Sequence, residues 1–322
     1  MKPKPTVLLV EKIHPKYLAE LDKRMRVIRP LSHDENTLAS VAQGEQIDAI
    51  VIRTKGCVSR KIIEASPKLK VIARHGIGVD HIDVAAATER GIWVVNTPGA
   101  SRVAAAEHTW AMILALAKRV PQGDRAVRAG DYGFRDRNKS LELEGKTLGV
   151  IGLGRIGSTV GRIAVHGFGM KLLYTDIVKY PAKEKQLRAK KVPLRTLLAK
   201  SDIVTIHTPL DESTRGMIGV EEIGFMQPHA FLVNCARGAI VKASAVAAAL
   251  NAGVLGGAAF DVFDPEIPST DDPLLKSDRT ALSTHFAAQT PEANLGYAAV
   301  VEDVFRVLAG KRPKWPVNDL KK

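Results

Sequence analysis

The sequence predicts an α/β protein made of two Rossmann-like or flavodoxin-like parallel-sheet domains with a cleft between them. Its 322 residues are enough for two domains of ordinary size. Short, continuously apolar runs alternate with amphipathic stretches along the chain, a pattern typical of parallel sheets covered by helices on both faces. Hydrophobic residues make up 45% of the chain, which is enough for a core and excludes a mainly disordered protein.

The first hundred residues contain one complete alternating series. Four apolar runs are predicted to be strands: 6–10, 48–52, 69–73 and 92–95. Amphipathic helices are expected between them, at 15–24, 34–43, 59–65 and 83–90. Asp34 is a suitable N-cap for the second helix, and Gly91 follows the end of the last one.

A longer helix is predicted over 101–119, followed by a polar arm over 120–143. The second half of this helix, Trp110 to Ala117, is apolar on every side, so it should be buried on every side. We therefore expect the helix to lie between domains or between subunits. The favoured arrangement is a homodimer formed through the helix and the arm.

A second alternating series begins at Lys146. The run after Lys146 predicts a strand and a tight turn, and 155–166 a helix. Five further strands are predicted, at 171–175, 202–206, 230–234, 256–260 and 279–283. An alanine-rich helix is expected over 242–252 and a last helix over 291–309, each followed by a glycine.

Charge and composition exclude several classes of protein. The 47 basic and 34 acidic side chains give a net charge of +13, concentrated in part at 179–200, but no aromatic residues follow Tyr180 there to stack on bases. We expect a solvated basic face and no nucleic-acid partner.

No apolar run is long enough to span a membrane, and no signal peptide precedes the first strand. The two cysteines, Cys57 and Cys235, favour a reducing cytoplasm, and no spacing predicts a metal site.

A glycine-rich turn follows the first strand of the second series. Gly152, Gly154 and Gly157 have the spacing of a dinucleotide-binding loop, with Arg155 and Ile156 between the last two. The first glycine permits the tight turn, the second allows the backbone to approach a pyrophosphate, and the third lets the helix pack on the strand. The helix N-terminus then offers free N–H groups to the anion.

Asp176 lies 19 residues beyond Gly157, at the end of the next strand. An acidic residue at about this distance binds the ribose hydroxyls of NAD and repels the 2′-phosphate of NADP. NAD is therefore favoured, although Lys179 and the basic stretch after it leave NADP open.

With these motifs in place, the chain resembles the D-isomer-specific 2-hydroxyacid dehydrogenases over almost its whole length. Seven segments carry the resemblance, in the order found in that family: 73–83, 96–109, 145–157, 207–219, 234–241, 258–268 and 283–293. The resemblance implies a substrate-binding domain formed by 1–100 plus 290–322. It implies an NAD-binding Rossmann domain at 101–289, with the active site in the cleft.

The resemblance also assigns a catalytic triad of Arg237, Glu266 and His285. Oxidising a 2-hydroxy acid requires a base for the hydroxyl proton, and an imidazole suits this role near neutral pH. Glu266 would bond the other ring nitrogen and stabilise the imidazolium. Arg237 would hold the substrate carboxylate with its planar fork. The 29 residues from Arg237 to Glu266 match the family spacing.

Further binding residues are expected at the ends of other strands. On the cofactor side the resemblance adds His207, Thr208, Pro209, Cys235, Ala236 and Asp261, the last for the nicotinamide carboxamide. On the substrate side we expect Arg53, Arg74, Gly76, Ile77, Gly78 and Val79, because ligands bind beyond the carboxyl ends of parallel strands. Arg53 would suit a distal phosphate, or it is a surface arginine paired with an acid.

The favoured function is reversible hydride transfer between NAD(H) and a 2-hydroxy or 2-oxo acid such as 3-phosphoglycerate, hydroxypyruvate or glyoxylate. A formate dehydrogenase, a relative of this family, is the alternative among enzymes. The resemblance implies that its histidine would pair with glutamine, whereas this chain has Glu266. An NAD-sensing corepressor of the same fold is the alternative among binding proteins. The chain departs from the family at Thr284, where proline is usual, and it ends soon after the last helix, so a regulatory domain is not expected.

Overall fold

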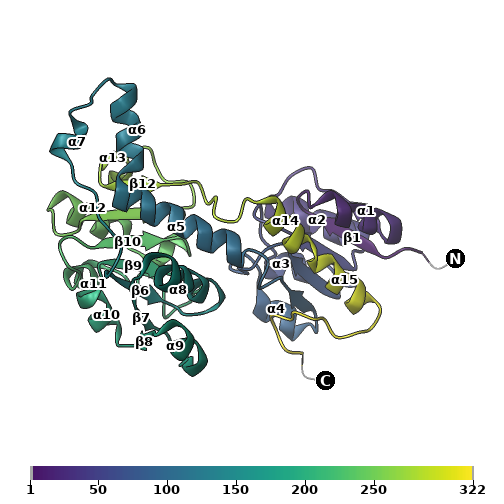
Figure 1. Ribbon diagram of the computed structural model, residues 1–322. Coiled ribbons are helices and arrows are strands. Elements are labelled where there is room, and N and C mark those ends of the chain that lie inside the picture. The colour runs from purple at the N-terminus through teal and green to yellow at the C-terminus, as the bar shows by residue number, and fades with distance from the viewer. Residues whose placement is uncertain (1–2, 321–322) are drawn as a thin grey trace. The chain divides into compact units, whose positions relative to one another are not determined.

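The computed structural model describes residues 3–320. The chain divides into two compact units, which Figure 1 shows coloured by residue number. The first unit contains the chain up to Ser101 and again from Gln289 onward, and the second contains Arg102–Ala288. Each unit is built around its own sheet, and all the strand pairs of both sheets are parallel.

The first unit holds a five-stranded sheet in the order β2-β1-β3-β4-β5. Its strands are β1 (Thr6–Leu9), β2 (Arg26–Ile28), β3 (Ala49–Ile52), β4 (Val71–Arg74) and β5 (Trp93–Val95). Its helices are α1 (Pro15–Arg24), α2 (Glu35–Glu45), α3 (Arg60–Glu64), α4 (Val84–Glu89), α14 (Pro291–Ala298) and α15 (Val300–Leu308). Valines of α15 pack with Val7 and Val71 of the sheet, which explains why the end of the chain belongs to this unit.

Two details of the first unit differ from the sequence prediction. The strand β2 was not predicted, because three half-exposed residues form no apolar run. The single helix expected over 291–309 is two helices that meet at Ala299. There the N–H of Ala299 donates to the carbonyl of Gly296, and the carbonyl of Ala299 accepts from the N–H of Glu302. The backbone hydrogen bonds thus change at this point from the α-helical i, i+4 spacing to the tighter i, i+3 spacing.

The second unit holds a seven-stranded sheet in the order β12-β11-β10-β9-β6-β7-β8. Its strands are β6 (Thr147–Ile151), β7 (Lys171–Thr175), β8 (Lys190–Lys191), β9 (Ile203–Ile206), β10 (Phe231–Asn234), β11 (Gly257–Phe260) and β12 (Thr280–Leu282). Its covering helices include α8 (Arg155–Phe168), α9 (Pro181–Leu187), α10 (Leu194–Lys200), α11 (Val220–Gly224), α12 (Ala243–Asn251) and α13 (Pro273–Lys276). The strand order reverses between β6 and β9, and ligands bind at such a switch point.

The long helix α5 (Arg102–Lys118) packs against the second unit. Trp110, Ile113 and Leu116 are buried, but Ala111 is exposed and Leu114 is half-buried. One face of the helix is therefore left uncovered by the rest of its unit, and its burial between domains or between subunits stays a prediction. No helix among the described residues is long and apolar enough to cross a membrane.

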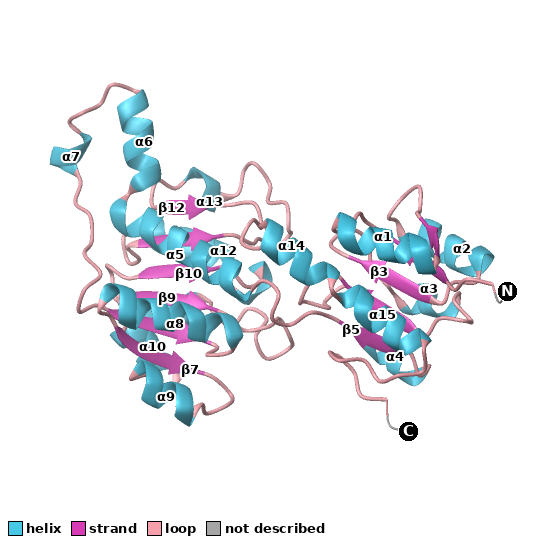
Figure 2. Cartoon of the chain, turned by 45° about the vertical axis from the view of Figure 1, so that its right-hand side comes forward, coloured by secondary structure: helices cyan, strands magenta, loops and turns pink. Residues whose placement is uncertain are grey.

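The arm at 120–143 is more regular than its polar, glycine-containing sequence suggested. It contains α6 (Val120–Arg128) and α7 (Phe134–Arg137), which project away from the sheet of their unit in Figure 1 and Figure 2. No residue of either helix is buried. Local contacts support α6, including the ion pair at 2.9 Å between Arg128 and Asp124 one turn apart.

Candidate active site

The glycine loop joins β6 to α8, and its three glycines have different packing. A Cβ on Gly157 would lie 2.1 Å from the carbonyl oxygen of Gly152, and one on Gly152 would lie 2.9 Å from the backbone of His207. Gly152 also has φ +91°, a conformation that favours glycine. A Cβ on Gly154 would meet nothing within 4 Å. The protein's own packing therefore requires the first and third glycines, whereas the second leaves open space at the N-terminus of α8.

Asp176 and Lys183 both form hydrogen bonds with the tip of this loop. One carboxylate oxygen of Asp176 accepts from the N–H of Leu153 at 2.8 Å, and the other accepts from Val178 at 2.9 Å. The Lys183 Nζ of α9 donates to the carbonyls of Leu153 at 2.6 Å and Gly154 at 3.0 Å. Each oxygen of Asp176 keeps a second lone pair, so the carboxylate can still accept from a ribose.

The segments after β9 and β10 lie beside the glycine loop in the sheet order. The Nε2 of His207 lies 3.0 Å from Thr205 Oγ1, and burial lowers the pKa of His207 to about 3, so the ring is neutral. Burial raises the pKa of the Cys235 thiol to about 12, so the thiol is also neutral. The Thr208 hydroxyl is buried with no hydrogen-bond partner among the described residues. An orphaned hydroxyl and the open space at Gly154 both fit a bound dinucleotide.

Arg237 occupies a tight turn after β10. The buried side chain of Asn234 donates to the carbonyl of Arg237 at 2.9 Å and accepts from the N–H of Ala236 at 3.0 Å. A Cβ on Gly238 would lie 2.0 Å from the carbonyl carbon of Phe263. These contacts fix the backbone that carries the guanidinium, whose Nη1 donates to the carbonyl of Ala236 at 2.7 Å.

His285 and Glu266 form a close pair at the end of β12. The Nδ1 of His285 lies 2.5 Å from Glu266 Oε1, and both side chains are accessible, with 42% and 61% of their surfaces exposed. An ionised carboxylate only accepts hydrogen bonds, so Nδ1 carries the proton in this pair. The other nitrogen, Nε2, is then the one available to exchange a proton with a ligand.

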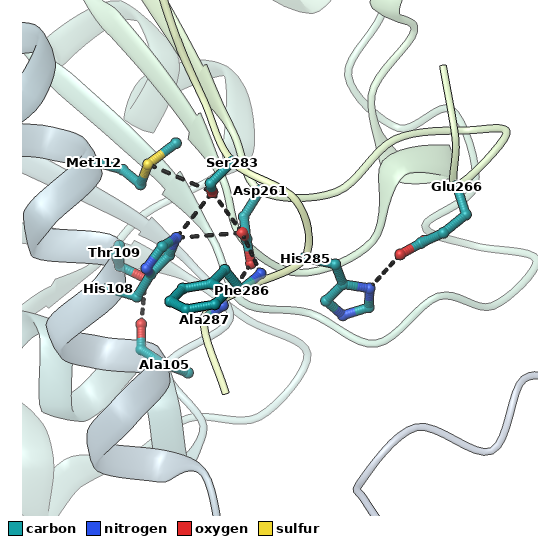
Figure 3. A network of polar contacts seen from close by, with 10 residues as sticks. All are labelled: Ala105, His108, Thr109, Met112, Asp261, Glu266, Ser283, His285, Phe286 and Ala287. Atoms are coloured by element: carbon teal, nitrogen blue, oxygen red, sulfur yellow. Dashed lines mark hydrogen bonds and ion pairs between the residues drawn. The ribbon is translucent and has the colours of Figure 1, made fainter. Parts of the chain in front are cut away.

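Asp261, which directly follows β11, is completely buried; in Figure 3 it lies on one side of His285 and Glu266 on the other. Burial raises the pKa of its carboxyl, but hydrogen bonds from His108, Ser283 and the N–H groups of Phe286 and Ala287 outweigh that effect and lower the pKa overall. The carboxylate therefore organises the loop that carries His285. Its contact with the nicotinamide stays a prediction.

The substrate residues expected in the first unit lie after β3 and β4. Arg53 Nη2 donates to Gln289 Oε1 at 2.9 Å. Arg74 braces its own loop, since Nε donates to Gly78 at 2.7 Å and Nη1 to His75 at 2.6 Å, both at carbonyl oxygens. Gly76 has φ +151° and lets that guanidinium pass close to the backbone. A substrate contact by any of these residues, or by Ile77 or Val79, stays a prediction.

His75 is only 1% exposed, and neither ring nitrogen has a hydrogen-bond partner among the described residues. Burial, followed by the charge of Arg53, lowers the pKa of His75 to about 4, so the folded protein holds it neutral. In the unfolded chain a histidine takes up its proton near pH 6.5. The free energy of unfolding should therefore fall as the pH decreases from about 6.5 to about 4, by about 3 kcal/mol for this group.

Urea unfolding at about pH 7 and pH 4.5 measures this effect in the wild type and in His75→Leu. We expect a smaller fall in the variant, because the group that protonates on unfolding is gone. The variant His166→Leu, which removes an exposed histidine, should behave as the wild type. An identical fall in all three proteins would contradict the assignment.

Comparison with known proteins identifies the family. Residues 110–287 match the family model described as D-isomer specific 2-hydroxyacid dehydrogenase, NAD binding domain. The chain belongs to this family. The matched region covers the glycine loop, Asp176, Arg237, Glu266 and His285. The second unit is thus an NAD-binding domain. The described part of the chain contains no cluster of three or more His, Cys, Asp or Glu side chains arranged to hold a metal ion.

Individual relatives agree with this family. The chain is 36% identical over 321 residues to a glyoxylate reductase of Korarchaeum cryptofilum, covering 98% of this chain and 95% of the relative. It is 41% identical over 272 residues to a D-3-phosphoglycerate dehydrogenase of Archaeoglobus fulgidus, but it spans only about half (51%) of that relative's length. The holo D-mandelate dehydrogenase of Rhodotorula graminis has a TM-score of 0.91 at 28% identity, with 99% of both chains covered.

Substitutions in the glycine loop should separate NAD binding from folding. Gly154→Ala places a methyl group in open space at the helix N-terminus, so we expect a dissociation constant for NADH at least about 10-fold higher, since overpacking costs about 1–3 kcal/mol. Gly157→Ala creates a backbone clash and should lower the melting temperature much more than Gly154→Ala.

Gly167→Ala is the matched control within α8, because its Cβ would make only an ordinary contact at 3.7 Å. Fluorescence titration with NADH and thermal melting are the two measurements. Unchanged NADH affinity in Gly154→Ala would show that the space beside Gly154 is not used by the dinucleotide.

Proposed function

We propose that the protein interconverts a 2-hydroxy acid and the corresponding 2-oxo acid with NAD, using His285 as the acid and base. The observation that carries this proposal is the pair formed by His285 Nδ1 and Glu266 Oε1 at 2.5 Å. The pair leaves Nε2 free and places a carboxylate against the ring. Such an arrangement is suited to moving one proton reversibly near neutral pH.

NAD, when bound, accepts or supplies the hydride. The remaining steps belong to side chains of this chain. In the oxidation direction, His285 Nε2 takes the hydroxyl proton of the substrate and Glu266 stabilises the resulting imidazolium. In the reduction direction, the same nitrogen returns the proton to the carbonyl oxygen. Arg237 binds the substrate carboxylate and orients the reacting carbon.

For the cofactor, we propose contacts from Gly154, Arg155 and Ile156 to the pyrophosphate and from Asp176 to the ribose. His207, Thr208, Pro209, Cys235 and Ala236 are proposed to line the remainder of the dinucleotide site. In the first unit, we propose that the N–H groups of residues 77–79 bind the substrate carboxylate. The loop geometry that Arg74 imposes supports this role.

The decisive experiment is turnover of NADH with a panel of glyoxylate, hydroxypyruvate and 3-phosphohydroxypyruvate, with formate and NAD as a separate reaction. We expect steady consumption of NADH with at least one 2-oxo acid and none of NAD with formate. NADH binding without turnover of any of these acids would favour the corepressor-like alternative. Oxidation of formate would favour a formate dehydrogenase.

We also propose that the protein is a homodimer through α5 and the arm. Val120, Val127 and Tyr132 of the arm expose 60%, 58% and 72% of their surfaces, and Ala111 lies exposed on α5. Such apolar surface favours a partner. Light scattering that gave the one-chain mass of 34.8 kDa would contradict this proposal.

We propose a reducing cytoplasm as the location of the protein, because its two cysteines are free.

A further inference from the structure

The backbone at His285 is held in an uncommon conformation. Its φ is +55°, in the left-handed region that residues with a side chain seldom adopt and that costs free energy unless the surroundings enforce it. Three hydrogen bonds enforce it, all to Asp261. The N–H of His285 donates to the Asp261 carbonyl at 2.7 Å, and the N–H groups of Phe286 and Ala287 donate to its carboxylate at 2.7 and 3.1 Å.

The carboxylate of Asp261 is itself held by two side chains (Figure 3). Ser283 Oγ donates to Oδ1 at 2.5 Å. His108 Nε2, from α5, lies 3.2 Å from the same oxygen and 2.9 Å from Ser283 Oγ. An ionised carboxylate only accepts, and the one hydroxyl proton of Ser283 goes to Asp261. His108 must therefore carry its proton on Nε2 and donate it into this network.

We propose that His108 is a positioning residue for His285. Its N–H fixes the Asp261 carboxylate in the orientation that caps Phe286 and Ala287, and that cap sets the angle of the reacting imidazole. This inference rests on the proposed role of His285 and adds a residue of α5 to it. Small displacements of a reacting group have large effects on rate. A hydrogen bond from His108 to Asp261 can therefore affect the rate of proton transfer at His285 without touching it.

The electrostatics of the network support a specific task for His108. Asp261 is completely buried, so every hydrogen bond that its carboxylate loses leaves charge without a donor. The His108 side chain is 17% exposed and makes no direct contact with His285 or Glu266 in this network. It reaches the 285–287 loop through Asp261, and its ring also lies 6.4 Å, centroid to centroid, from the ring of Phe286.

The test compares His108→Leu, which removes the donor, with His108→Gln, whose amide N–H can replace it. In His108→Leu we expect kcat for 2-oxo acid reduction to fall about 10-fold, the loss of one hydrogen bond to a charged group, with the NADH dissociation constant within twofold of wild type. His108→Gln should recover most of this loss. His166→Leu, an exposed histidine of α8, is the matched control and should change neither quantity.

Hydrogen exchange provides a second readout that does not depend on turnover. The amides of Phe286 and Ala287 should exchange about 10-fold faster in His108→Leu than in the wild type, and at the wild-type rate in His108→Gln. Ser283→Ala, which breaks the network elsewhere, should also accelerate them. If His108→Leu folds poorly, Ser283→Ala together with His108→Gln still decides the matter.

A lower melting temperature in His108→Leu with unchanged kcat and unchanged exchange at 286 and 287 would overturn the proposal and leave His108 a packing residue. If the wild type reduced no 2-oxo acid, the proposed function would fail instead. The exchange measurement would then still show whether His108 orders the loop. The two failures are therefore distinguishable.

Discussion

Replacing His285 with alanine is expected to lower kcat for 2-oxo acid reduction by about 10²–10⁴-fold, the contribution typical of a positioned acid or base. The physical reason is that Nε2 of His285 is the nitrogen left free by the 2.5 Å contact between Nδ1 and Glu266. The other histidine–carboxylate pairs among the described residues, His108 with Asp261 and His229 with Asp202, involve carboxylates that are far less exposed than Glu266. Steady-state rates and the NADH dissociation constant, measured together, separate a loss of chemistry from a loss of binding.

Glu266→Gln is the companion variant, because it keeps the size of the side chain and removes its charge. An imidazolium without its carboxylate partner is less stable, so the pH above which oxo-acid reduction declines should move to lower values. The pH–rate profiles of wild type and variant give this directly. Superimposable profiles would show that Glu266 does not stabilise the protonated form of His285. That conclusion would hold whatever the rate of His285→Ala.

Much of the fold follows from local patterns in the sequence. The strands β3, β7 and β10 are centred on short apolar runs, and the predictions place them within a residue or two. The parallel α/β class and the glycine loop follow from the same alternation. The edge strand β8 consists of two lysines, so no hydrophobic signal marks it, and only pairing with β7 makes it a strand.

The candidate site could be predicted where glycines recur at a known spacing and where the chain resembles a known family. The resemblance assigned Glu266 and His285, and the structure places their side chains in contact. His108, Asn234 and Lys183 were not identified as site residues. Their roles depend on contacts between segments far apart in the chain: His108 meets Ser283 175 positions later. Lys183 was grouped with a basic surface, although its ammonium caps two carbonyls of the glycine loop.

Substitution of Arg53 should show whether the substrate carries an anionic group at the end away from its carboxylate. Arg53 borders a hollow of about 540 Å³ in the first unit that is also lined by Lys12, Arg29 and Lys55. Glu11 is the one carboxylate among the described residues that line this hollow. Burial alone would raise the pKa of Glu11, but the N–H groups of Lys55 and Thr54 and the charge of Arg53 lower it overall. Its Oε2 accepts from the N–H groups of residues 53–55. The cationic side chains that line the hollow outnumber this one carboxylate, so the hollow keeps an excess of positive charge.

Arg53→Ala is therefore expected to raise the KM for 3-phosphohydroxypyruvate by about 10–100-fold, the loss of a charge-assisted hydrogen bond, and to leave glyoxylate reduction nearly unchanged. The difference arises because only the first substrate carries a distal anion. Arg60→Ala is the matched control, since it removes an exposed arginine of the same unit that pairs with Glu89. Equal losses on both substrates, or none on either, would mean that Arg53 serves its contact with Gln289 rather than a phosphate. A small unphosphorylated 2-oxo acid would then be the better substrate assignment, because the cationic hollow would have no part in binding it.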